Sequence, residues 1–136
     1  IEAELERTFR DGSRVYANYT FQEPEDRETH RRLPNVAKHK ANVGADLAIT
    51  EYLNANLNVF WSDERPRVTG DPRDALAKYT LVDLTLIAKD FAGGLELRLS
   101  GHNILDEDYE DPEDMSVPGD LPRDGVSVIG EVLYRF

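Results

Sequence analysis

The sequence predicts an all-β chain of about seven antiparallel strands that follow one another up and down, as in a segment of a transmembrane β-barrel. Three observations predict this class. Apolar residues recur at every second position along most of the chain, which is the period of a strand with one apolar face. The connections alternate between short and long, and aromatic residues gather near the strand ends, as they do in the walls of outer-membrane barrels.

Seven segments show the alternation, and each is expected to form one strand. They are residues 1–9, 14–21, 40–50, 53–62, 81–89, 95–102 and 126–136. The first alternates three glutamates with apolar residues, and the second follows an Asp-Gly-Ser turn and ends in aromatics. The third and fourth alternate small or aliphatic residues with polar ones, including three asparagines in the fourth. The fifth is less regular because Ile87 falls on its polar side, whereas the sixth and seventh keep the period.

The connections separate a barrel from a soluble sandwich, in which strands also alternate. Long connections are expected at about 22–35, 62–78 and 106–124, and short ones at 10–13, 50–51 and 90–93. Outer-membrane barrels have short periplasmic turns and long extracellular loops, and a sandwich gives no reason for so regular an alternation. Because the last long loop precedes the last strand, the C-terminus is expected on the short-turn, periplasmic side.

Aromatic residues provide a second indication. Those expected on the loop side are Tyr19, Phe21, Trp61, Tyr79 and Tyr109, and those expected on the turn side are Phe9, Phe91, Tyr134 and Phe136. Barrels carry aromatic girdles at both membrane interfaces, although aromatic residues also favour strands in general. The mid-strand positions of the apolar face are aliphatic.

Composition limits the other function classes. The 136 residues include 16 basic and 27 acidic side chains, for a formal net charge of −11, which argues against a nucleic-acid partner because phosphate binding needs clustered Lys and Arg. The absence of cysteine excludes disulfides and thiolate chemistry. The chain begins at Ile1 without a signal-peptide pattern, so it is expected to be a mature or truncated product.

Four stretches resemble, in order and spacing, parts of the TonB-dependent outer-membrane receptors. They are residues 33–44, 79–100, 103–109 and 133–136, of which 103–109 (Asn-Ile-Leu-Asp-Glu-Asp-Tyr) is similar to the family's Asn-Leu-Phe-Asp-x-x-Tyr sequence. The resemblance covers essentially residues 1–136. It implies a barrel of about 22 strands, an N-terminal plug inside it, and a TonB box that couples to the inner membrane.

Seven strands cannot close such a barrel, and open edges in lipid would leave backbone groups without partners. The chain is therefore expected to be the C-terminal part of a larger barrel in the bacterial outer membrane. The resemblance implies outer-membrane lipid and lipopolysaccharide, the remaining strands and plug, TonB through the missing N-terminal part, and the barrel-assembly machinery as partners. The expected function is import of a metal chelate, vitamin or other scarce nutrient. The alternatives are a small barrel that closes by oligomerising and a soluble all-β binding module.

The expected site residues form three groups. Lumen-facing candidates are Glu2, Glu4, Glu6, Asn54, Asn56, Asn58, Glu96 and Arg98. The assembly-signal candidates, which the resemblance implies, are Gly130, Val132, Tyr134 and Phe136. The loop 106–124 holds nine acidic residues and one basic residue, and Asp106, Asp108, Glu110 and Asp111 are its weak candidates for a Ca²⁺ site, although they do not match an EF-hand. No catalytic motif occurs, and neither an enzyme nor a cofactor is expected.

Overall fold

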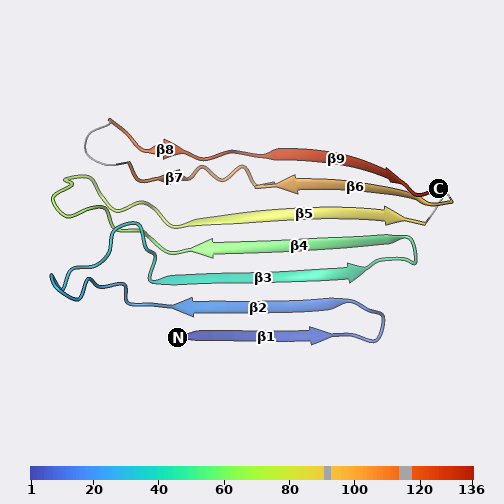
Figure 1. Cartoon of the computed structure of the whole chain (residues 1–136), viewed down its shortest axis with the longest axis horizontal. Coiled ribbons are helices and arrows are strands. Elements are labelled where there is room, and N and C mark those ends of the chain that lie inside the picture. Colours follow the sequence, from blue (N-terminus) through green and yellow to red (C-terminus); the bar gives the residue numbers. More distant parts are fainter. Residues whose placement is uncertain (91–92, 114–117) are drawn as a thin grey trace.

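Seven strands form one antiparallel sheet, in the order β1-β2-β3-β4-β5-β6-β9, in the computed structural model (Figure 1). The structure describes residues 1–90, 93–113 and 118–136. The strands of the sheet are β1 (Glu2–Thr8), β2 (Arg14–Phe21), β3 (His39–Ala48), β4 (Leu53–Ser62), β5 (Tyr79–Lys89), β6 (Leu95–His102) and β9 (Ser127–Tyr134). The predicted meander of seven strands is therefore confirmed.

Two connections within the described residues are tight turns at one end of the sheet (Figure 1). Between β1 and β2, the Asp11 carboxylate accepts a hydrogen bond from the Ser13 backbone N–H at 3.0 Å, and Gly12 adopts a positive φ of 86°, which glycine takes without steric cost. Between β3 and β4, the Thr50 hydroxyl accepts hydrogen bonds from the backbone N–H groups of Tyr52 and Leu53. β3 ends at Ala48, two residues before the end of its apolar period at residue 50, and it begins one residue earlier, at His39.

The long connections gather at the opposite end of the sheet (Figure 1). The last of them contains a small hairpin that the sequence did not predict, formed by β7 (Glu110–Asp111) and β8 (Leu121–Pro122). Strands of two residues are too short to show a period of two, which explains why the pattern missed them. The C-terminus lies at the short-turn end (Figure 1), as the sequence predicts.

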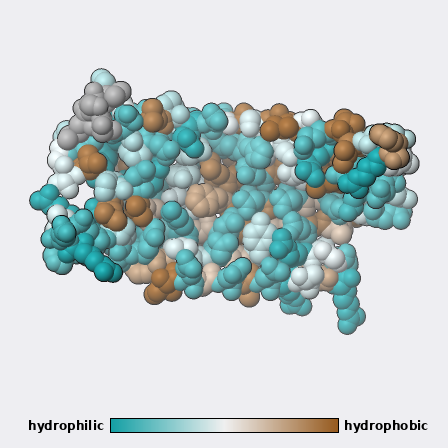
Figure 2. Space-filling view, in the orientation of Figure 1, coloured by the Kyte–Doolittle hydropathy of each residue, from teal (hydrophilic) through white to brown (hydrophobic). Residues whose placement is uncertain are grey.

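The sheet is a single layer without a conventional core. Among the described residues, the buried hydrophobic side chains are Ala37 and Leu76, and both belong to the long connections. Large apolar side chains on the strands are exposed instead, such as Val43 at 53% and Leu99 at 50%. Hydrophilic residues dominate the face seen in Figure 2, with hydrophobic residues in separate groups. A soluble sandwich would cover its apolar face with a second layer, and this sheet does not.

Strand length suits a membrane wall. β3 and β4 have 10 residues and β5 has 11, close to the ~9–11 tilted residues that cross a bilayer. In the described part of the chain, no helix has the length and apolar composition needed to cross a membrane. The outer edges of the sheet are β1 and β9, which are exposed along their whole length. The open sheet agrees with the expectation of a partial barrel.

Candidate functional site: the polar face and the loop junction

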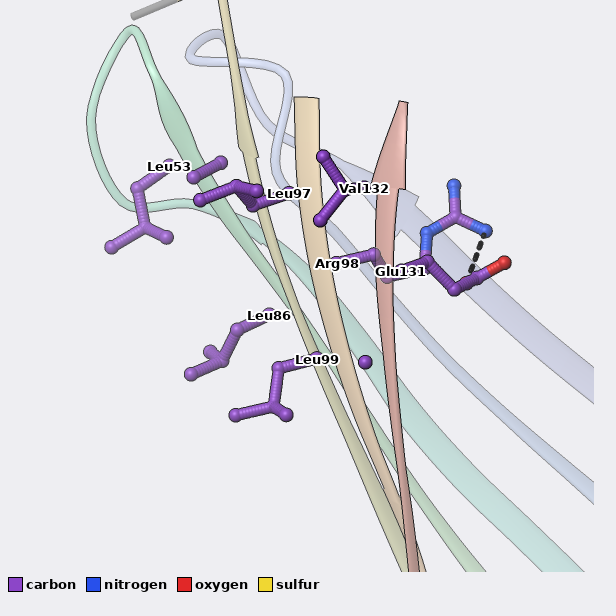
Figure 3. Close-up of a pocket in the computed structure, with 9 residues that line it drawn as sticks. Leu53, Leu86, Leu97, Arg98, Leu99, Glu131 and Val132 are labelled. Carbon is purple, nitrogen blue, oxygen red and sulfur yellow. Dashed lines mark ion pairs between the residues drawn. The ribbon is translucent and has the colours of Figure 1, made fainter. Parts of the chain in front are cut away.

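All eight expected lumen-facing residues lie on one face of the sheet. Residues directly opposite each other in an antiparallel pair share a face, and the pairing register connects the rows across the strands. We call this face, with Glu2, Glu4, Glu6, Asn54, Asn56, Asn58, Glu96 and Arg98, the polar face. Figure 3 shows both faces near β9: Leu86, Leu97 and Leu99 point to one side, and Arg98, which pairs with Glu131 at 3.7 Å, points to the other.

A hydrogen-bonded network runs across the polar face near its turn end. The Arg14 guanidinium donates to Asp46 at 2.8 and 2.6 Å and to Glu6 at 3.3 Å. The Asn56 amide donates to the second oxygen of Asp46 at 2.5 Å. These contacts join β1, β2, β3 and β4, and hydrogen bonds to charged groups are among the stronger ones in proteins. The network therefore fixes three charged side chains and one amide, from four neighbouring strands, on the polar face.

Tyr16 crosses the polar face over a glycine. A Cβ atom at Gly44 would overlap the Tyr16 ring, so the ring lies directly against the backbone of β3. The Tyr16 hydroxyl donates to Asn58 on β4 at 3.3 Å. An aromatic ring over a strand glycine replaces the missing side-chain contact. Gly44 thus gives Tyr16 the room to connect β2 with β4.

The three long connections meet at Arg65, a residue that is only 6% exposed. Its Nη1 atom donates to Asn35 at 3.2 Å and to Asp111 at 2.8 Å, and its Nη2 atom donates to the backbone carbonyl of Glu110. The Asn35 backbone N–H donates in turn to the Pro66 carbonyl at 2.8 Å. One buried guanidinium therefore joins the β2–β3, β4–β5 and β6–β9 connections. We call this contact set the loop junction.

Two further arginines of the β4–β5 connection extend the loop junction. Arg67 donates both terminal nitrogens to Asp120, and this hydrogen-bonded guanidinium holds the pKa of Asp120 at about 2. Arg73 donates to Asp71 at 2.6 and 2.9 Å and to the Gly119 carbonyl at 2.9 Å. The pKa of Asp71 is lowered to about 2, chiefly by these bonds from Arg73. Both carboxylates stay ionised at all ordinary pH values.

An aromatic stack lies beside Arg65 at the loop end of the polar face. Tyr79 and Tyr109 stack with ring centroids 4.6 Å apart, and Phe60 lies 6.1 Å from Tyr79. The Arg65 guanidinium sits 5.2 Å from the Tyr79 centroid, within the range of a cation–π contact. Tyr79 pairs with Ser62 on the polar face, so it does not belong to an outer girdle. Trp61 and Tyr19 do share the apolar face, whereas Phe91 lies outside the described residues.

The four weak metal candidates have separate surroundings. Asp111 pairs with Arg65 at 2.8 Å and with Arg123 at 3.4 Å. Asp106 accepts the backbone N–H of Val126 at 3.0 Å, Glu110 contributes its carbonyl to Arg65, and Asp108 lines a pocket beside Tyr109. Within residues 1–90, 93–113 and 118–136, no three His, Asp or Glu side chains are grouped so that they could hold a metal ion. Of the four candidates, Asp111 has its charge paired with an arginine of the neighbouring connection.

The assembly-signal candidates lie at the end of the sheet. Gly130 and Val132 pair with Leu99 and Leu97 on the apolar face, where they line a shallow groove (Figure 3). The Tyr134 and Phe136 rings lie 6.4 Å apart, and both side chains are exposed. These positions are open to a partner, and their role as a signal stays a prediction.

Sequence patterns did not single out the arginines of the loop junction or the Tyr16–Gly44 contact. Arg65 and Arg67 lie in a connection with equal numbers of acidic and basic residues, so no net charge drew attention to it. The signal that could have found these arginines is that their connection and the acidic loop after β6 are expected at the same end of the meander. Arginines in one long loop and clustered acidic residues in another loop at the same end of a meander predict ion pairs between individual residues of the two loops.

Comparison with known proteins agrees with this architecture. A family model described as "TonB dependent receptor-like, beta-barrel" matches residues 1–104. The crystal structure of a mutant ferric enterobactin receptor from Pseudomonas aeruginosa is similar, with a TM-score of 0.73 and 18% sequence identity over 97% of this chain and 22% of that chain. The chain thus spans about a fifth of the length of that receptor, and at this identity the likeness shows the fold alone. No curated protein matches the chain.

The resemblance seen in the sequence is therefore confirmed by the family match and by the fold. TonB-dependent receptors are transporters, which confirms the expectation that the chain is not an enzyme. The match extends over most of the strands, from β1 to β6, and the structural likeness adds β9. The chain belongs to the TonB-dependent receptor-like β-barrel family.

Proposed function

We propose that the chain is part of the barrel wall of a bacterial outer-membrane receptor that imports a scarce nutrient, such as a metal chelate or vitamin. The observation that carries the proposal is the two-faced single layer. Its apolar face suits contact with outer-membrane lipid, and its polar face suits a water-containing lumen. In water, the exposed leucines and valines of this face would form an unfavourable apolar surface.

The polar face would line the lumen and contact the plug. The Arg14–Asp46–Asn56 contacts and the Tyr16–Asn58 contact hold polar groups in place across three strands, and the Arg14–Glu6 contact adds β1. Such fixed donors and acceptors can hydrogen-bond a folded domain inside the barrel without first losing side-chain freedom. The plug, and the TonB box through which TonB acts on it, would lie in parts of the receptor outside these residues.

The loop junction would form part of the extracellular mouth. It lies at the end of the sheet opposite the tight turns, and the turn side of outer-membrane barrels is periplasmic. Lipopolysaccharide would surround this mouth. The barrel-assembly machinery would meet the lateral edge of the sheet formed by β9 and the C-terminal residues, through Gly130, Val132, Tyr134 and Phe136. Assembly by strand addition fits an exposed edge such as β9.

The similar crystal structure supports a metal chelate as the substrate class, since that protein is a ferric enterobactin receptor. The test is uptake of radiolabelled ferric chelates by cells that produce the full-length receptor containing this segment. Energy-dependent uptake that is lost when TonB is deleted is expected. Uptake of none of a panel of ferric chelates, vitamins and oligosaccharides would contradict the import function.

A small barrel that closes by oligomerising is the second candidate, and the two open edges favour it. The two candidates differ in the size of the protein in cells. A product of about 15 kDa that runs as a defined oligomer in detergent supports the small barrel. A product several times longer, with this sequence as its C-terminal part, supports the receptor.

A further inference from the structure

Carboxylates on the polar face follow one rule inside the sheet. With Glu2 and Glu4 set aside, every strand carboxylate of this face contacts an arginine or histidine side chain that comes from an adjacent strand or from the residue directly after that strand. The pairs are Glu6–Arg14 at 3.3 Å, Asp46–Arg14 at 2.6 Å, Asp83–His102 at 3.6 Å, Glu96–Arg135 at 3.8 Å and Glu131–Arg98 at 3.7 Å. Opposite charges on neighbouring strands stabilise a sheet, and like charges destabilise it.

Glu2 and Glu4 are the two exceptions among the described residues, and both lie on β1. Their neighbours on β2 are the uncharged Thr20 and Asn18. No ion pair involves either glutamate in the described part of the chain, and β1 is exposed along its length. Same-face positions two residues apart lie about 7 Å from each other, so the two carboxylates also repel. In the described part of the chain no strand lies on the side of β1 that faces away from β2, so no basic side chain can reach the two glutamates from that side.

We propose that the open edge of β1 pairs with a strand that carries Lys or Arg opposite Glu2 and Glu4, and that this strand immediately precedes β1 in the full-length receptor. The inference rests on the barrel function proposed above. In this meander each strand pairs with the next strand of the sheet along the chain, so the strand beside β1 is the preceding one. Because β1 begins at the loop end (Figure 1), a long connection joins them.

The edges of the chain itself do not supply these cations. Two copies that paired through β1 in antiparallel fashion would bring glutamates opposite glutamates, which destabilises the pair. Along β9, the polar-face residues are Ser127, Ile129, Glu131 and Leu133, and none is basic. A second copy is therefore a poor partner for β1 through either edge. A different strand with basic residues at alternate positions satisfies both the backbone groups and the charges.

The experiment uses the full-length receptor, with the residues opposite Glu2 and Glu4 identified from the strand before β1. Glu4→Lys is compared with Glu51→Lys, a control with the same change of charge in an exposed turn at the opposite end of the sheet. The measurement is the temperature at which the barrel loses its folded mobility in gel electrophoresis. We expect Glu4→Lys to lower this temperature and Glu51→Lys to leave it unchanged. Replacing the opposing basic residue by Glu in the Glu4→Lys protein should restore it.

Three results would overturn the proposal. They are a preceding strand without Lys or Arg at the opposing positions, equal behaviour of Glu4→Lys and Glu51→Lys, and no restoration by the exchanged pair. If Glu4→Lys does not insert, Glu4→Gln replaces it, and then removal of the opposing charge should add no further loss. Nutrient uptake by the unmodified receptor is measured separately, so a failed charge exchange with intact uptake rejects this inference and leaves the proposed function standing.

Discussion

Replacing Val43 by arginine is expected to block insertion of the barrel, because Val43 lies near the middle of the apolar face. It is the fifth of the 10 residues of β3, and its neighbours across the strands are Ala17 and Val59. At ~3.3 Å per residue, it lies about 13 Å from one end of the strand and about 17 Å from the other. With a tilt of about 40°, this position falls near the middle of an apolar band about 25 Å tall.

An arginine at the bilayer midplane costs about 2–4 kcal/mol. Since 1.4 kcal/mol corresponds to a tenfold change in an equilibrium, the ratio of inserted to non-inserted receptor should fall about 30- to 700-fold. Asn18→Arg is the matched control because Asn18 lies one row away on the polar face, opposite Glu4 and Asn42. This arginine would face water and a carboxylate, so a change within about 0.5 kcal/mol is expected.

The assay is refolding of the full-length receptor into phospholipid vesicles over a range of urea concentrations, with the inserted fraction read from the gel mobility of unheated samples. Equal losses in the two variants would refute the assignment of the faces. A greater loss for Asn18→Arg would show that the faces are reversed.

Three further predictions concern the loop junction and the polar face. Arg65→Lys removes the planar set of donors, and losing one hydrogen bond to a charged group costs about 1.5–3 kcal/mol, so hydrogen exchange of the β7–β8 hairpin should rise at least tenfold while that of the sheet does not change. Gly44→Ala should destabilise the barrel by about 1–3 kcal/mol because the added Cβ overlaps the Tyr16 ring. Tyr16→Ala should therefore cost less stability in the Gly44→Ala protein than in the unmodified protein. The lowered pKa of Asp120 implies a contribution to loop stability that is full above its unfolded pKa near 4 and is lost as pH falls through about 2. Carbon NMR of the Asp120 carboxyl should show this titration, and Arg67→Ala should move it towards pH 4; a titration near pH 4 in the unmodified protein would contradict the ion pair.

The sequence alone was sufficient for the seven strands of the large sheet and for its two faces, although not for the short β7–β8 hairpin. Apolar residues at every second position determine which side chains share a face, because the pleat turns successive residues to opposite sides. This is why Glu2, Asn54 and Arg98, on three different strands, could be assigned to the same face. The order of short and long connections also follows from the sequence, since each connection lies between two periodic segments.

Only the tertiary structure decided what the polar and loop residues contact. Arg65 meets Asn35 and Asp111, which lie 30 and 46 residues away in the sequence, and no local pattern encodes such a pair. The sequence shows that the loop after β6 is acidic, but only the structure shows that arginines of the preceding long loop pair with its Asp111 and Asp120. Local periodicity determines strands because neighbouring residues are fixed by the backbone, whereas contacts between loops depend on how the whole sheet brings distant segments together.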